Sequence, residues 1–375
     1  MEINKKELYF LCACFIWITP FYLPTAIAVL LRCGLIALVM TTQKIKFNPM
    51  LGLTLVYVIM TIVSTFVFDY GMTNLLKTVS VMSVFVSCIL CASNPSNNKA
   101  MSNGMLKGML LYFLIDAYFI FVQKGIGMND NAQPLYFSGG KFDVCYLYLF
   151  LMILVFLKCK RMKKYQQLLM VLFGMFMSFY VDCTTGVLGI FAFCAVMFLP
   201  EKFKAGKIKY WWIGGMLLIH YLIVFVQIQS TNPWLSYFIT EVLNKQITLT
   251  GRVKIYNRFG EIMQNHWLFG YGYTSDRIIE VTKLANTQNG FLQVIYVGGL
   301  VSFTVFMIMM FYIIAQIIKI KNKKEQNILF SALMAFFAIA VIEIPFHSVL
   351  FYMLLAIIYV YSCREKGVKD VQRIT

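Results

Sequence analysis

The sequence predicts an all-α polytopic membrane protein with about twelve transmembrane helices, both termini in the cytoplasm and one large extracytoplasmic loop. Of its 375 residues, 60% are hydrophobic and only 13% are charged, whereas soluble domains are roughly 45–50% apolar and about 25% charged. The mean hydropathy is +0.74. Apolar runs long enough to cross a bilayer alternate with short lysine-rich hinges. These observations predict a single integral membrane domain over residues 1–375.

The apolar runs define the expected membrane spans in order. The first run, residues 8–40, is too long for one crossing, and Pro20 and Pro24 break it at a tight external turn. We expect spans at 7–21, 23–41, 48–68, 73–92, 104–123, 142–158, 166–181, 184–199, 210–229, 289–318, 328–344 and 346–362.

The positions of lysine and arginine orient these spans. With the N-terminus in the cytoplasm, two-thirds of the 33 Lys and Arg fall in cytoplasmic hinges, including "KCKRMKK" and "KIKNKK", as the positive-inside rule requires. Removing one span would place these two hinges on opposite sides of the membrane. The net charge of +17 thus arises mainly in the hinges. No nucleic-acid-binding motif accompanies it, so nucleic acid is not an expected partner.

Residues 229–288 form the predicted extracytoplasmic loop. Within it, Thr250 is a plausible N-cap, and the apolar spacing from Gly251 to about Asn265 predicts an amphipathic helix that could lie on the outer membrane surface. Arg252 and Arg258 diverge by roughly 120° on such a helix, so both reach one small anion only if the helix docks beside it. Arg258 is expected to pair with Glu261.

The rest of the loop leads into a long apolar segment. Gly270 and Gly272 bracket Tyr271, which predicts a turn or a close backbone approach. The helix over 289–318 would be roughly 45 Å long, so it is expected to start outside the bilayer. Its N-terminus near Gln288 and Asn289 would present N–H groups to an anion, and together with the arginines this suits a phosphate. The alternative is an interfacial helix whose arginines face lipid headgroups.

Other charged residues are candidates for substrate contact. Arg32 and Asp116 lie inside spans near mid-membrane, where they could pair with each other or contact substrate. His220 is expected to be a packed helix residue. Candidates for a general base at the outer face are Asp69, Asp182, His266, Glu343 and His347, and Glu343 is the best of them because an acid at the end of an apolar span is costly unless used.

The cysteines and carboxylates do not point to metal or redox chemistry. The ten Cys lie almost entirely in apolar spans, where they are expected to be packing residues, and the long loop has none. No carboxylate cluster resembles a dedicated divalent-metal site. We therefore expect no cofactor and no metal.

One order of short motifs resembles a known family. "TGR", a helix, "GYG", "NGFLQ" and an apolar span containing "GG" follow one another within residues 180–345. This order, together with the topology, resembles the O-antigen polymerase and O-antigen ligase superfamily (Wzy-like). In that family the arginine after Ser/Thr-Gly, which corresponds to Arg252, is implicated in handling the lipid pyrophosphate, and Gly270 and Gly272 match its Gly-x-Gly.

Two positions depart from the family pattern. A His-Asn pair often precedes the following helix in the family, but this chain has Gln288-Asn289, which favours a polymerase over a ligase. The Ser-Arg expected near an earlier span is replaced by "DCTTG", with Thr184 and Thr185 and no Arg, and the alternatives for its place are Asp182 and a cation elsewhere in the chain.

The resemblance implies a metal-independent glycosyltransferase of the cell (plasma or inner) membrane that polymerises a surface polysaccharide. It would transfer glycan from an undecaprenyl-pyrophosphate carrier to a sugar hydroxyl of a second lipid-linked repeat unit, with a chain-length regulator, a flippase and membrane lipid as further partners. The catalytic candidates are Arg252, Arg258 and Glu343. The alternatives are a ligase or, in another class, a lipid-linked oligosaccharide flippase, for which Arg32 and Asp116 are the supporting features.

Overall fold

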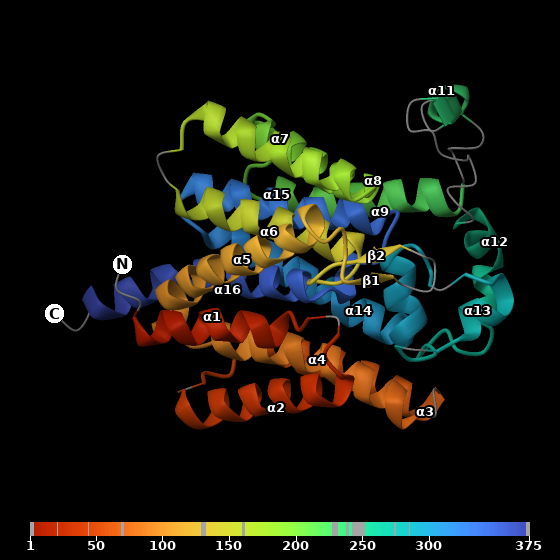
Figure 1. The fold of residues 1–375 in the computed structure, drawn as a ribbon, viewed down its shortest axis with the longest axis horizontal. Helices are drawn as coiled ribbons and strands as arrows, with labels where there is room; N and C mark the ends of the chain where they lie inside the picture. The colour runs from red at the N-terminus through yellow and green to blue at the C-terminus, as the bar shows by residue number, and fades with distance from the viewer. Residues whose placement is uncertain are drawn as a thin grey trace.

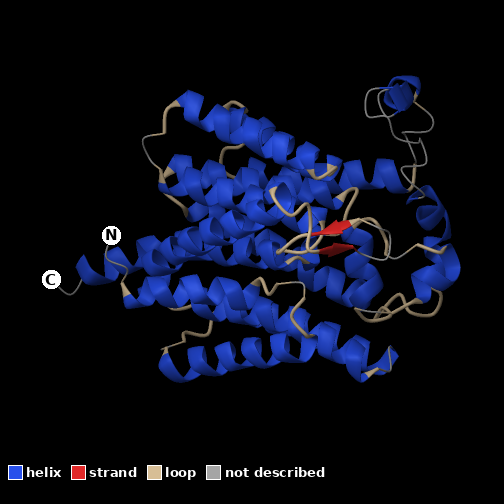
Figure 2. Cartoon of the chain, in the orientation of Figure 1, coloured by secondary structure: helices blue, strands red, loops and turns tan. Residues whose placement is uncertain are grey.

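The computed structural model describes residues 4–20, 22–43, 45–68, 71–128, 133–159, 162–226, 232–237, 240–241, 252–273, 275–284 and 286–372. Nearly all secondary structure in this part of the chain is helical (Figure 2). One two-stranded antiparallel ribbon, β1 (Gly127–Met128) with β2 (Pro134–Leu135), is the described exception. The predicted all-α class is therefore correct.

A helix lies in each of the twelve segments predicted from the sequence. In the first half of the chain these are α1 (Lys5–Trp17), α2 (Thr25–Thr42), α3 (Pro49–Phe68), α4 (Met72–Ala92), α5 (Asn98–Phe121) and α6 (Lys141–Lys158). In the second half they are α7 (Lys164–Tyr180), α8 (Thr184–Phe198), α9 (Ile208–Val224), α14 (Gly290–Lys319), α15 (Lys323–Ala340) and α16 (Val349–Gln372). Shorter elements connect them: η1 (Pro95–Asn97), η2 (Glu201–Phe203), α11 (Pro233–Tyr237), α12 (Arg252–Ile262), α13 (Arg277–Thr282) and η4 (Pro345–His347).

Five of the described helical segments are long and apolar enough to cross a membrane, judged by length and composition. They are α2, α3, α4, the segment Pro95–Phe121 that contains α5, and α14. Outer helices also expose large apolar side chains that a water-soluble protein would bury. Examples are Leu30 and Met40 of α2, which are 71% and 62% exposed, and Leu168 and Phe179 of α7, which are 57% and 67% exposed. The chain has the helices and the apolar surface of a membrane protein.

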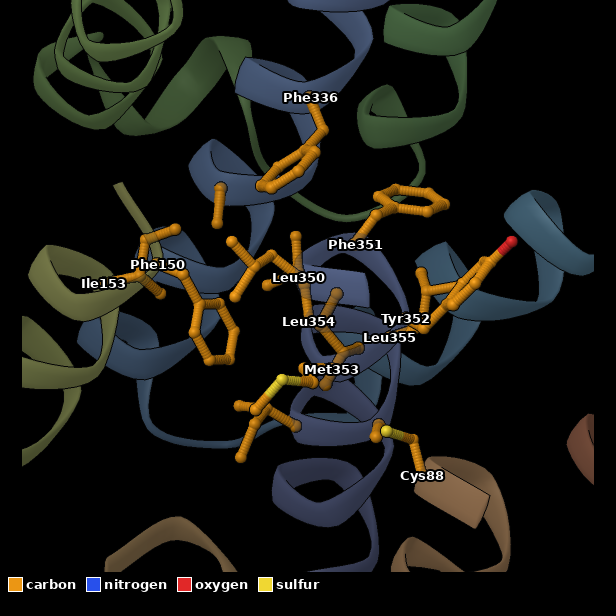
Figure 3. Packing of buried hydrophobic residues seen from close by; sticks show 14 of the residues in the cluster. Cys88, Phe150, Ile153, Phe336, Leu350, Phe351, Tyr352, Met353, Leu354 and Leu355 are labelled. Atoms are coloured by element: carbon orange, nitrogen blue, oxygen red, sulfur yellow. The ribbon is translucent and has the colours of Figure 1, made fainter. Parts of the chain in front are cut away.

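The core surrounds α16, which is apolar on all sides along its first half and is buried there (Figure 3). Phe351 and Leu354 of α16 pack among Phe150 of α6, Phe336 of α15 and Cys88 of α4. This packing holds the turn between α15 and α16 in a fixed place, and that turn carries two of the predicted site residues, Glu343 and His347.

The two ends of the helix bundle differ in what they carry. The start of α1 and the end of α16 lie at one end, and α12 and α13 of the long loop lie at the other (Figure 1). The turn between α15 and α16 is at the same end as α12, because Arg252 contacts it. Elements of the long loop therefore gather at the end of the bundle remote from both termini.

The thirty-residue α14 is not the continuous helix that the sequence suggested. Gly299 has φ 69° and ψ −171°, and the helix kinks there. The interrupted backbone pairs with the 267–272 segment: the Leu300 N–H donates to the Trp267 carbonyl at 2.7 Å. In return, the Tyr271 and Gly272 N–H groups donate to carbonyls of α14 at 2.8 and 3.0 Å. Bonding of this kind makes an irregular backbone tolerable inside a membrane protein.

The amphipathic helix is present as α12, but its apolar face is buried in protein and not in a membrane surface. Ile255, Tyr256, Phe259 and Ile262 form a small core with residues of α13 and α14. The predicted cap Thr250 lies outside the described residues. Because α12 packs on other helices, the direction of each of its arginines is fixed by protein contacts.

Candidate functional site

Arg252, the first residue of α12, reaches the turn that follows α15. Its Nε donates to the Ile342 carbonyl at 3.0 Å, and its Nη2 lies 3.9 Å from Glu343 Oε2. The two side chains are 14% and 5% exposed. At 3.9 Å the ionic groups attract each other without a hydrogen bond. Two of the three predicted catalytic residues, from segments far apart in the chain, are thus neighbours.

Glu343 is a buried acid beyond the end of its helix. The span predicted over 328–344 ends too late, since α15 stops at Ala340. Glu343 Oε1 accepts from the Ile344 N–H at 3.2 Å, and Oε2 has no hydrogen-bond partner among the described residues. Burial raises the pKa of this carboxyl, although the charge of Arg252 opposes the shift. A carboxylate with a raised pKa can act as a proton acceptor.

The same turn contains backbone carbonyls that have no hydrogen-bond partner within α15, because the helix ends there. Arg252 binds the Ile342 carbonyl, and the Asn289 amide donates to the Val341 carbonyl at 2.8 Å. A cation near a helix C-terminus is favoured by the helix dipole. Arg252 therefore also has a structural function, because it fixes the long loop to the end of α15.

His347 is the third predicted residue at this turn. Its Nε2 is 3.0 Å from the Tyr57 hydroxyl, and the ring of Tyr273 approaches edge-on with centroids 5.4 Å apart. Nδ1 is buried and has no partner among the described residues. The His347 residue also lines a cavity of about 180 Å³ between α13, the start of α14 and η4.

Lys141 belongs to this group of charges although the sequence did not single it out as a site residue. It opens α6, lies 3.8 Å from Asp182 Oδ2, and lowers the pKa of Glu343 after the larger effects of burial, Arg252 and the Ile344 N–H. The signal was a cation at the first position of an apolar span, directly after two glycines. Asp182 itself is 84% exposed and belongs to the α7–α8 turn.

Arg258 does not join Arg252. Its guanidinium forms two 2.8 Å bonds to Glu261, which confirms that pairing, and Nη1 donates to the Val281 carbonyl at the end of α13. The predicted divergence of the two arginines is thus correct. Arg258 fastens α12 to α13 and has no described contact with Glu343, so its catalytic role stays a prediction.

Gly270 and Gly272 serve the backbone approach that the sequence predicted. Both have positive φ, 68° and 92°. A Cβ on Gly270 would lie 2.6 Å from the Tyr296 carbonyl oxygen, and one on Gly272 would lie 2.7 Å from the Thr65 Cα. The described contacts of these glycines are with α14 and α3, where the loop docks, and their binding of substrate stays a prediction.

The N-terminus of α14 has a side-chain cap, which occupies one of the N–H groups that the sequence predicted to face an anion. Asn289 Oδ1 accepts from the Leu292 N–H at 3.0 Å, and its Nδ2 is also 3.0 Å from His220 Nδ1. Asn289 is fully buried and His220 is 7% exposed. Gln288 bonds to Asn286 through its side chain at 2.8 Å. These residues order the loop where it joins α14.

Arg32 and Asp116 do not form the pair considered from the sequence. Arg32 donates to the Ile16 and Trp17 carbonyls at the end of α1 and, from α2, to Ser80 of α4. Asp116 instead accepts two bonds from Ser138, at 3.1 and 2.5 Å. Neutral polar groups therefore satisfy both side chains. For Arg32 these are carbonyls at the C-terminus of α1, which are suitable partners for a cation. For Asp116 they are the N–H and the hydroxyl of Ser138.

Two further general-base candidates remain, His266 and Asp69. His266 stacks on Tyr271 with centroids 4.1 Å apart. Asp69 lies outside the described residues. Neither the family models nor the curated proteins that were compared match this sequence. The site is therefore interpreted from its own geometry.

The burial of His347 predicts an acid-dependent stability. Burial lowers its pKa to about 4, against about 6.5 for an unfolded histidine. Between those values the unfolded chain binds a proton that the folded chain rejects, so stability falls as the pH drops from about 6.5 to 4, by up to about 3 kcal/mol. Thermal unfolding in detergent across this range should show a steeper decline for the wild type than for His347→Gln. Equal slopes would contradict the assignment.

Proposed function

We propose that this chain is a polysaccharide polymerase that transfers glycan from an undecaprenyl-pyrophosphate carrier to a sugar hydroxyl of another lipid-linked repeat unit. The observation that carries the proposal is the position of Arg252 beside the buried Glu343, at the bundle end remote from both termini. A cation next to a carboxylate of raised pKa supplies the two groups that such a transfer needs.

Each group has one task in the reaction. The acceptor hydroxyl oxygen attacks the anomeric carbon of the donor sugar, and the bond from that carbon to the diphosphate breaks with its electron pair leaving on the phosphate oxygen. Arg252 stabilises the charge that develops on this oxygen. Glu343 accepts the proton of the attacking hydroxyl. The bond energy comes from the donor, so no nucleotide sugar is required.

The proposal includes an orientation and a number of crossings. The twelve apolar segments all cross the cell membrane, the termini and the basic hinges face the cytoplasm, and α12 and α13 face outward, where lipid-linked repeat units are presented. Positive hinges on the cytoplasmic side support this orientation.

The transporter alternative has less support. Arg32 and Asp116 are each bonded to other groups. A broken transporter helix usually directs its half-helix ends at a substrate, whereas the break in α14 is occupied by backbone of the 267–272 segment. A ligase remains the second candidate within the enzyme class, because it would use the same leaving group.

The decisive experiment gives the purified protein one defined lipid-linked repeat unit, without nucleotide sugar or metal. A polymerase should yield a ladder of products, and Glu343→Gln should slow it by about 10²–10⁴-fold because the proton acceptor is lost. Glu280→Gln, which alters an acid that is 62% exposed on α13, is the matched control and should leave the ladder intact. A complete absence of products from active, folded protein would refute the proposal, as would full activity of Glu343→Gln.

A further inference from the structure

A second feature of the outer end is a cavity of about 180 Å³ at the turn that also carries Glu343. Its walls come from the long loop, from the first turns of α14 and from the turn between α15 and α16, and Ile344, the residue after Glu343, is part of them. Pockets for drug-sized ligands are larger, roughly 300–1,000 Å³. The cavity therefore suits one small ring next to the proposed reaction centre.

His347 gives this cavity a built polar wall. The residue is 7% exposed, and its only described hydrogen bond joins Nε2 to Tyr57. Nδ1 is buried without a partner among the described residues. The wall of the cavity therefore includes a polar side chain whose hydrogen-bonding capacity is not fully used by described residues.

The chemistry of the wall selects the kind of ligand. The wall combines a group that only accepts hydrogen bonds, the Asp276 carboxylate, with groups that can donate or accept, the Asn286 amide and the His347 imidazole. A hydroxyl group satisfies both cases, because it donates and accepts. The rings of Tyr273 and Tyr296 border the cavity as apolar surfaces, and Asn286 adds an amide. Asp276 is the one charged residue in the described wall, which disfavours a phosphate.

We propose that this cavity binds one sugar ring of the acceptor chain, with ring hydroxyls on the polar side chains of its wall, His347 among them, so that the acceptor is presented to Glu343. The inference rests on the proposed function for the identity of the chain as a glycan acceptor, but the binding site itself is tested separately. Neutral polyhydroxylated rings fit the wall, and the diphosphate stays with Arg252.

Binding is measured on the full-length protein in lipid nanodiscs, with methyl glycosides of common bacterial hexoses and N-acetylhexosamines as probes and saturation-transfer NMR as the readout. At least one glycoside should bind to the wild type. His347→Phe, which keeps the ring but removes both nitrogens, should weaken binding by about tenfold. Asn286→Trp, a change at a half-buried loop position, should fill the cavity and abolish binding even if His347→Phe folds poorly.

Arg277→Gln is the matched control, because this arginine pairs with Glu280 on the surface of α13, and it should bind glycosides as the wild type does. If no glycoside binds while the lipid-linked unit still gives a ladder, the cavity assignment is overturned and the polymerase stands. If glycosides bind in a His347-dependent way but no ladder forms, the cavity assignment is supported and the polymerase is overturned. Binding that both cavity variants leave unchanged also overturns the assignment.

Discussion

Replacing Arg252 with Ala is expected to reduce glycan polymerisation by at least about 10²-fold, the usual effect of removing one group that stabilises transition-state charge. The guanidinium is held beside Glu343 and the Ile342 carbonyl, so no other described residue on α12 can take its place. The measurement is the rate of ladder formation from a defined lipid-linked repeat unit. In cells, single repeat units should still reach the outer face while long chains disappear.

Arg252 also fixes the loop to α15, so stability must be separated from chemistry. Loss of the bond to the part-buried Ile342 carbonyl costs roughly 1–3 kcal/mol at most, and thermal unfolding reports this cost. Arg252→Lys keeps the positive charge and loses the fork-shaped donor, so it should recover part of the activity. Arg277→Gln removes a cation that is 35% exposed and should change neither quantity.

The outcomes in cells distinguish the function classes. Accumulation of repeat units on the cytoplasmic face in Arg252→Ala would indicate a flippase, because the block then precedes polymerisation. Full-speed polymerisation by a well-folded Arg252→Ala protein would remove the central residue from the mechanism. Mapping that placed the 252–284 segment in the cytosol would have the same consequence.

Local patterns in the sequence determined much of what could be predicted. Apolar runs located the helices, because a helix that packs on others must carry apolar residues along the buried surface. Prolines located the break between α1 and α2, which lie on either side of residues 18–24. The spacing of Arg258 and Glu261 along one helix was sufficient to predict their bonds, which measure 2.8 Å.

Contacts between distant segments could not be read in the same way. Arg252 and Glu343 were candidates on separate grounds, but only the packing of α12 against α13 and α14 brings one to the other. Arg32 and Asp116 seemed complementary by charge, yet nearby carbonyls and hydroxyls satisfied both. A charged residue inside a membrane span indicates that it needs a polar partner, but the sequence does not identify that partner.

The break in α14 was missed because its signal resembles ordinary helix composition. Two adjacent glycines in an apolar span are compatible with a continuous membrane helix, in which glycine is common. Only the docking of residues 267–272 shows that Gly299 adopts a left-handed backbone there. The helix-period pattern continues across the break and therefore predicts one helix where the structure has two.

Gly299→Ala is expected to be the most destabilising single-methyl change in the described part of the chain. The backbone at φ 69° and ψ −171° is accessible almost only to glycine. A Cβ there would overlap the Leu268 carbonyl and the Phe269 nitrogen, which are backbone atoms and cannot rotate away. Relief would require the 267–272 segment to leave α14 and expose the Leu300 N–H and its neighbours. We expect a loss above about 4 kcal/mol, seen as failed expression or a much lower unfolding temperature.

Gly260→Ala is the matched control, because Gly260 lies within α12 and no atom is within 4 Å of its hypothetical Cβ. Alanine in an exposed helical position is favoured over glycine by roughly 0.5–1 kcal/mol, so this variant should be as stable as the wild type or more so. The comparison separates a general intolerance of added methyl groups from a specific demand at the kink. If Gly299→Ala and Gly260→Ala have the same unfolding temperature, the backbone at residue 299 must have helical angles that accept alanine. The loop would then lack its attachment to α14, and the placement of Arg252 would depend on α12 packing alone.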